Sequence, residues 1–151
     1  MSRSDVFAIT LDSGRVPPDA TAWEEAVGVI RIGDFQEDFH ASLSFWSADD
    51  YRRSWRSAFV ALADDSAATS CLVTSITDPA NSNFIFCWPL YRSGETVFVQ
   101  NSLIFLEELT SPFDPAEPWH SVLPRETVSE EGRPISEWAT TMSALGAFFS
   151  D

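Results

Sequence analysis

The stretch AVGVIRIGDFQEDFHASLSF, residues 26–45, decides the fold because it contains two β-strand patterns joined by a turn signal. AVGVIRI is rich in β-branched residues, and Gly33-Asp34 follows it as the turn. From Phe35 to Phe45, apolar residues alternate with polar ones, which is the period of a half-buried strand. The stretch therefore predicts two tightly joined strands with an acidic face near the turn.

The segment that follows, SADDYRRSWRSAFVAL, has the pattern of an amphipathic helix. Ser47 can accept a hydrogen bond from an early backbone N–H, and Asp49 and Asp50 lie at the positive end of the helix dipole. The apolar residues recur at helical spacing and form one stripe. They are Tyr51, Trp55, Ala58, Phe59 and Leu62. We expect a helix over residues 47–63, with its arginines on a solvated face.

Three further strand patterns follow, at residues 70–77, 83–91 and 95–101. Their linkers, DPANS and RSG, are short, so an antiparallel meander is the expected topology. Pro89 removes a backbone donor inside the second of these strands and predicts a bulge or a sheet edge. The segment SLIFLEEL, residues 102–109, allows one helical turn or two, with Glu107 and Glu108 pointing outward.

The two ends of the chain complete the expected organisation. Residues 1–25 form a poorly patterned N-terminal arm, in which VFAITL allows a short strand, and residues 26–151 form a single domain. Helical apolar spacing from Trp138 to Phe149 predicts a C-terminal helix. The expected fold class is α+β, with an antiparallel sheet and these two helices.

The charge of the chain narrows the kind of partner it can bind. Its 23 Asp and Glu face nine cationic residues, all of them Arg, which gives a net charge of −14. Nucleic acids and anionic membranes are bound through clusters of Lys and Arg, so neither is an expected partner. The residues from Ser93 to Pro124 include no Lys or Arg at all. The acidity favours a basic partner, although it could instead serve only to keep an aromatic-rich protein soluble.

The compartment is read from what the sequence lacks. The N-terminal residues show no basic region followed by an apolar run, and no window reaches the ~18 to 20 apolar residues that a membrane span needs. We therefore expect a cytoplasmic protein. Cys71 and Cys87 lie in strand-like apolar runs and are expected to be buried, reduced thiols.

Motifs for catalysis or for cofactor binding are missing from the sequence. His40 and His120 have no Cys or carboxylate at metal-ligand spacing, and there is no glycine-rich phosphate loop. We expect no cofactor and no enzymatic activity. One alternative stays open, in which Asp34, Glu37 and Asp38 hold a divalent metal in a small acidic enzyme.

Four segments, in this order, resemble the immunity proteins of contact-dependent growth inhibition systems, the CdiI family. They are IGDFQEDFHASLSFWSADDYRRSW (32–55), SCLVTSI (70–76), WPLYRSGETVFVQNSLIF (88–105) and SEEGRPISEW (129–138). The resemblance is to the group that protects against a ribosomal-RNA-cleaving toxin, the CdiA C-terminal domain. It implies a twisted antiparallel sheet in a Whirly-like arrangement, a fold used elsewhere to bind single-stranded DNA. A single-stranded nucleic-acid binder is therefore a weaker alternative.

The resemblance also implies a function, which is inhibition of a basic nuclease toxin by blocking the access of its RNA substrate. An RNA-cleaving domain presents positive potential to its substrate, and an acidic protein can occupy the same field. The expected toxin-binding carboxylates are Asp34, Glu37, Asp38, Glu107 and Glu108. Trp46, Trp55, Trp88 and Trp138 are expected in the core, because large aromatic residues in strand and helix stripes normally pack inward.

Overall fold

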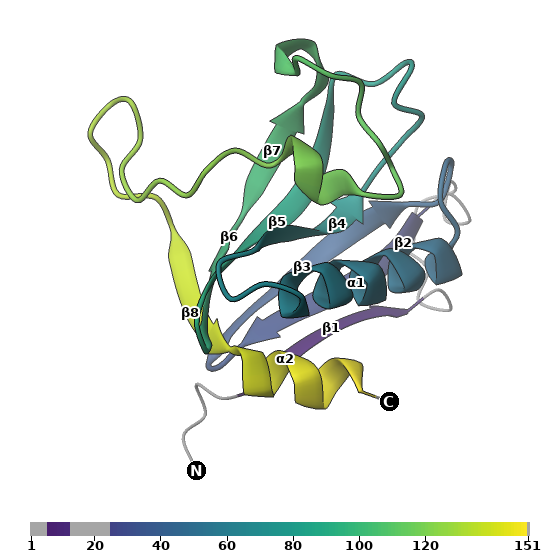
Figure 1. Ribbon diagram of the computed structural model, residues 1–151. Helices are drawn as coiled ribbons and strands as arrows, with labels where there is room; N and C mark the ends of the chain where they lie inside the picture. Colours follow the sequence, from purple (N-terminus) through teal and green to yellow (C-terminus); the bar gives the residue numbers. More distant parts are fainter. Residues whose placement is uncertain (1–5, 13–24, 151) are drawn as a thin grey trace.

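The computed structural model describes residues 6–12 and 25–150, which form two antiparallel sheets and two α-helices (Figure 1). The strands are β1 (Phe7–Asp12), β2 (Glu25–Ile32), β3 (Phe35–Ser42), β4 (Thr69–Ser75), β5 (Phe84–Ser93), β6 (Thr96–Gln100), β7 (Ser102–Phe105) and β8 (Glu137–Thr141). The helices are α1 (Ala48–Ala63), α2 (Met142–Phe149) and two short 3-10 helices, η3 (Leu106–Glu108) and η4 (Pro118–Ser121). The predicted α+β class is confirmed, and the strands divide between two sheets where one was expected.

Sheet A contains the strand pair that the sequence predicted. β2 and β3 are antiparallel neighbours whose ends, Ile32 and Phe35, face each other across the turn. Gly33 has φ 60°, a conformation that glycine adopts without strain, and Gly at this first position suits a two-residue hairpin turn. A second glycine, Gly28, leaves room for the Phe39 ring, since a Cβ at Gly28 would lie 2.3 Å from Phe39 Cζ.

The N-terminal arm contributes one strand to the same sheet. Phe7–Asp12 form β1, the strand that VFAITL allowed, and they pair antiparallel with β2. Phe7, Ile9 and Leu11 are buried, so this part of the arm belongs to the hydrophobic core. Residues 1–5 and 13–24 of the arm lie outside the described residues.

Helix α1 begins as the sequence predicted. Ser47 Oγ accepts a hydrogen bond from Asp50 N at 3.1 Å, and the Asp50 carboxylate accepts one from Ser47 N at 2.9 Å, which completes a capping box. The stripe is buried except for Phe59, which is half-buried against the core. Trp55 Nε1 donates to Val73 O at 2.7 Å and fixes the helix on β4.

Sheet B contains the predicted meander of β4, β5 and β6, and β7 continues along the same edge of β5 as β6. β6 and β7 pair with β5 in one continuous register. β6 and β7 are therefore two parts of one strand that is interrupted at Asn101. The interruption lies beside Trp88 and Pro89 of β5, and Pro89 has no N–H to donate. The bulge in this sheet is on β4, between Val73 and Ser75, and not at Pro89.

Two segments differ from the elements expected for them. Residues 102–109 are strand β7 followed by the single turn η3, because Ile104 is buried as a strand residue opposite Ile85. The C-terminal helix does not begin near Trp138. Trp138 belongs to β8, which pairs with β6, and α2 begins at Met142 after the Thr141 cap. Helical spacing continued into β8 by chance, and strand pairing overrode it.

One hairpin turn, from Arg92 to Glu95, caps both α-helices. The Arg92 guanidinium donates to the carbonyls of Leu62 and Ala63 at the C-terminus of α1, at 3.0 and 3.1 Å. At the start of α2, Glu95 O accepts from Met142 N at 2.8 Å, and the Glu95 carboxylate accepts from Ser143 N at 2.9 Å. The hydrogen bonds from Ser143 lower the pKa of Glu95. Positive charge at a helix C-terminus and negative charge at an N-terminus both suit the helix dipole.

The two sheets are joined by aromatic side chains. The Tyr51 hydroxyl donates to Ser42 O at the end of β3, at 2.6 Å, and accepts from Ile76 N just after β4, at 3.0 Å. Burial raises the pKa of Tyr51 to about 12, so the hydroxyl keeps its proton. Elsewhere in the contact between the two sheets, which we call the joint, Phe35 of β3 stacks on Trp138 with 4.1 Å between ring centroids. Both rings pack near Trp88.

Candidate functional site

The three carboxylates of the β2–β3 hairpin do not form one cluster. Asp34 is exposed in the turn itself. Glu37 lies opposite Ile30, on the face of sheet A that carries Phe35 and the buried side chains, although Glu37 is itself exposed. Asp38 is the next residue along β3 and therefore points to the opposite face. The predicted patch is thus split between two faces of the sheet.

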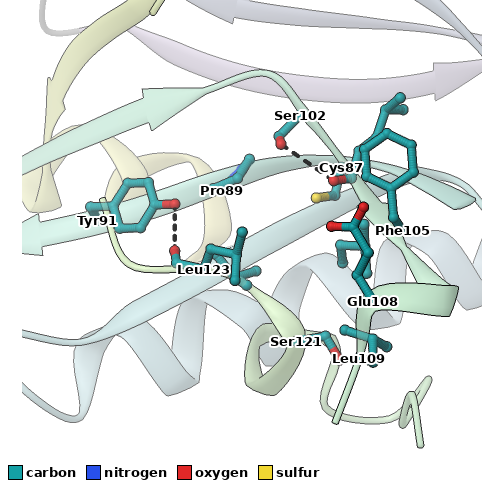
Figure 2. Close-up of a pocket in the computed structure, with 12 residues that line it drawn as sticks. Cys87, Pro89, Tyr91, Ser102, Phe105, Glu108, Leu109, Ser121 and Leu123 are labelled. Atoms are coloured by element: carbon teal, nitrogen blue, oxygen red, sulfur yellow. Dashed lines mark hydrogen bonds between the residues drawn. The ribbon is translucent and has the colours of Figure 1, made fainter. Parts of the chain in front are cut away.

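Glu107 and Glu108 lie in η3, directly after β7, and both are exposed. Glu108 also lines a cavity of about 120 Å³ next to the outer face of β5. Figure 2 shows this pocket between Cys87, Pro89 and Tyr91 of β5 and the chain around Leu123. Figure 2 also shows the Glu108 carboxylate beside Phe105, which ends β7. This pair of carboxylates stands where the meander ends, as the sequence predicted.

Asn101 connects the hairpin to the β7 region. Its Nδ2 donates to Glu37 Oε2 at 3.5 Å, which places Glu37 beside the interruption between β6 and β7. From Asn101 to Phe105 the extended chain of β7 spans about 13 Å, and the two η3 carboxylates follow directly after it. Glu37 and Glu107 therefore stand at the two ends of one short strand, although they lie far apart in the sequence.

The described residues do not show the arrangement that the metal-enzyme alternative needs. Within residues 6–12 and 25–150, no group of three or more His, Cys, Asp and Glu side chains could hold a metal ion. The split of Glu37 from Asp38 explains this at the hairpin, because their carboxylates point away from each other. Cys71 and Cys87 are buried and free, and the pKa of Cys71 is raised by the hydrogen bond with Cys87 and by burial.

A group of exposed aromatic residues, which the sequence pattern did not predict, lies beside these carboxylates. Phe84 lies directly opposite Phe105 on the β5–β7 pair, and Phe86 lies opposite Leu103. Phe84, Phe86 and Phe105 are 39%, 46% and 46% exposed. The segment NFIFCWPLY is apolar on both faces and therefore resembles a strand that is covered on both sides. Phe84 lies beyond the end of β4 and has no partner residue on that strand, which the apolar pattern does not reveal.

Predicted core tryptophans lie where they were expected. Trp55 and Trp88 are each 2% exposed, and Trp46 and Trp138 are half-buried against the core. None of these four rings is among the exposed large apolar residues that the structure describes. In the same ranges, no helix is long and apolar enough to cross a bilayer.

The segment that walls the pocket is held by Arg125. Its guanidinium donates to both oxygens of Glu137 in β8, at 2.7 and 2.8 Å, and lies 3.9 Å from the centre of the Phe98 ring. Nearby, Tyr91 OH donates to Leu123 O at 2.8 Å. The hydrogen bonds from Arg125 lower the pKa of Glu137 below its usual value of 4.5.

The lowered pKa of Glu137 predicts a pH dependence. A carboxylate whose folded pKa is depressed stabilises the fold above its unfolded pKa, and this contribution disappears as the pH falls through the folded pKa. We expect Glu137→Gln to lower the urea midpoint at pH 7, and the difference from wild type to shrink as the pH falls below 4.5. Urea unfolding across this pH range measures it. A gap between the two proteins that stayed constant with pH would contradict the assigned role of the ion pair.

Comparison with known proteins gives consistent matches. The family model of the CdiI N-terminal domain matches residues 41–148. The immunity protein CdiI of Enterobacter cloacae subsp. cloacae is 38% identical over 121 residues, which are 80% of this chain and 81% of that protein. A chain of the solved CdiA-CT/CdiI toxin and immunity complex from Enterobacter cloacae superposes with a TM-score of 0.83 and 33% identity, over 96% of this chain and 97% of the other.

Proposed function

Because this chain belongs to the CdiI family of immunity proteins of contact-dependent growth inhibition, we propose that it binds and neutralises a cognate CdiA C-terminal toxin domain that cleaves RNA. The structural likeness over 96% of the chain to a member of a toxin and immunity complex carries the proposal. The protein acts as a stoichiometric inhibitor in the cytoplasm, without catalysis, and blocks the access of ribosomal RNA to the toxin.

The charge of the chain supports a nuclease as the target. A domain that cleaves RNA needs positive potential to attract its substrate, and a protein of net charge −14 is attracted by the same potential. The segment from Ser93 to Pro124, which carries β6, β7 and η3, includes no Lys or Arg that would oppose this attraction. Occupying the toxin's cationic surface would then exclude RNA from it.

The carboxylates divide into two roles. Glu37, Glu107 and Glu108 border the same strand, β7, and we assign to them direct contacts with basic groups of the toxin. Asp34 and Asp38 lie in the turn and on the opposite face of the hairpin, and they add to the long-range field. Long-range attraction raises the rate of association, whereas close contacts set the rate of dissociation and the specificity.

The test is reconstitution with the toxin domain encoded beside this protein. Ribosomes mixed with the purified toxin domain should show cleaved ribosomal RNA, and one equivalent of this protein should abolish the cleavage. A catalytically inactive toxin should bind an RNA oligonucleotide and release it when this protein is added. Full toxin activity at a large molar excess of this protein would overturn the proposal. Neutralisation with RNA still bound would overturn only the blocking mechanism.

Association with the toxin is expected to depend strongly on salt. Electrostatic steering is screened when the Debye length falls below the distance over which the partners attract each other. We expect the association rate constant to fall about tenfold or more between roughly 20 mM and 500 mM NaCl, with a smaller change in the dissociation rate. Stopped-flow or biolayer measurements provide both rates. An association rate independent of salt would show that the acidity serves only solubility.

A further inference from the structure

Three phenylalanines form one exposed apolar surface at the end of sheet B. Phe84 packs edge-on against Phe86, with 5.3 Å between ring centroids, and lies 6.4 Å from Phe105. Direct pairing of Phe84 with Phe105 and of Phe86 with Leu103 places all four side chains on the same face of the sheet. We call this set, Phe84, Phe86, Leu103 and Phe105, the phenylalanine surface.

The phenylalanine surface is the uncovered continuation of the core. Phe86 and Trp88 are two residues apart on β5 and share a face, but Trp88 is 2% exposed because Phe35 and Trp138 pack near it. β3 of sheet A crosses sheet B at this level, since Glu37 contacts Asn101 and Ser42 N donates to Ser75 Oγ of β4 at 3.2 Å. Beyond that point no element of the described residues shields Phe84 or Phe86, which stay more than a third exposed.

Exposure of these rings is costly for an isolated protein. Burying a Phe side chain fully is worth about 1.5–3 kcal/mol relative to leaving it in water, and contiguous apolar surface on a soluble protein usually marks an interaction site. A hollow of about 220 Å³ adjoins Phe84 and Phe86 and is lined by polar groups from Ser75, Thr77 and Ser82. An apolar centre with a polar rim is the common organisation of protein interfaces.

The charges around the surface decide which partner it fits. Glu37 stands at one end, and Glu107 and Glu108 stand at the other. No Lys or Arg occurs in the segments 69–91 and 93–124. These segments include β4 to β7 and their connections, and the residue between them is the capping residue Arg92. A second copy of this chain would bring the same carboxylates against these, whereas a cationic partner would pair with them. The molecule itself shows an Arg on a Phe ring, at Arg125 and Phe98.

From the contacts, exposure and charges together, we infer that the phenylalanine surface is the apolar centre of the toxin interface and receives Arg or aliphatic side chains of the cationic toxin. This inference rests on the proposed function. Phe86, which is 46% exposed and shares a face of β5 with the buried Trp88, is the principal anchor, and Glu37, Glu107 and Glu108 form the acidic rim that pairs with basic groups around it. Sequence-distant elements, β3 and the β5–β7 pair, therefore supply one binding site.

The test measures the dissociation constant with the inactive toxin domain. Phe86→Ala should weaken binding at least about 30-fold, and Phe105→Ala should weaken it by a smaller factor. The control is Val60→Ala, because Val60 is an apolar residue of α1 that is 66% exposed. It should change binding less than about threefold. Glu37→Arg and Asp38→Arg form a second pair of variants. Glu37 lies on the face of sheet A that is turned toward sheet B, and Asp38 lies on the opposite face, so Glu37→Arg should weaken binding more.

Each outcome separates the inference from the proposed function. If the wild type binds tightly and neither Phe86→Ala nor Phe105→Ala changes the dissociation constant, the inference is overturned and the proposed function is not. No binding by wild type overturns the proposed function. Sedimentation of the free protein adds a third arm, in which a wild-type dimer that Phe86→Ala dissociates would assign the surface to a second copy and overturn the inference. Thermal unfolding of both Phe variants within a few degrees of wild type is expected and ties any loss of binding to the surface.

Discussion

Replacing Trp88 by alanine is expected to lower the free energy of unfolding by about 3–5 kcal/mol, which is the usual cost of removing a buried Trp. Trp88 is 2% exposed and packs against both Phe35 of sheet A and Trp138 of sheet B, which stack on each other. Its removal leaves a cavity at the joint of the two sheets, where neither sheet can close without moving the other. Chemical denaturation followed by circular dichroism measures the change.

The control for Trp88 is Trp88→Phe, which keeps an aromatic ring beside the stacked pair of Phe35 and Trp138. We expect it to cost less than half of the alanine change, since a smaller cavity remains. A loss below about 1 kcal/mol for Trp88→Ala would contradict the assignment of Trp88 to the joint. Equal losses for the two variants would mean that the indole ring, rather than the volume of a ring, is what the joint needs.

Tyr51→Phe is expected to cost about 2–3 kcal/mol, although it removes a single oxygen atom. That oxygen donates to Ser42 O and accepts from Ile76 N, so the change removes a hydrogen-bond partner from two backbone groups. Ile76 is 1% exposed, and water cannot replace the lost hydrogen bond there. Urea unfolding of the variant against wild type gives the cost.

Tyr91→Phe is the matched control, because the chain has only these two tyrosines. The Tyr91 hydroxyl also donates to a backbone carbonyl, but its acceptor residue, Leu123, is 73% exposed. Water can bind to that carbonyl after the substitution, so we expect a loss below about 1 kcal/mol. Similar losses of unfolding free energy for the two variants would contradict the assignment of a particular stabilising role to the Tyr51 hydroxyl between the sheets.

Local signals predicted the elements that depend on neighbouring residues. The capping box at Ser47, the turn at Gly33 and the stripe of α1 all occur within a few residues of the chain, and each was found as expected. Where the strands pair depends on distant residues. The helical spacing around Trp138 was overridden by pairing with β6, and the ambiguous segment 102–109 became a strand because β5 offered it an edge.

The candidate site was predicted only in part, for a similar reason. Alternation along β3 already places Glu37 with Phe35 and Asp38 on the other side, yet closeness in sequence grouped the two carboxylates. Exposure of Phe84 and Phe86 could not be read from an apolar strand, since the pattern does not reveal how far the covering sheet extends. Asn101 joins the two acidic regions across 64 positions of sequence, a contact that only the fold creates.

The turn that carries Arg92 and Glu95 has a consequence for the order of folding. The last carbonyls of α1 and the first amides of α2 find their partners on this turn, so neither helix end is complete until β5 and β6 have paired. Closing one hairpin therefore sets the length of two helices that are remote in the chain. In the native protein, opening of that hairpin would release both ends together, and the amide protons of Met142 and Ser143 would exchange with solvent in step with those of the hairpin, as one cooperative unit.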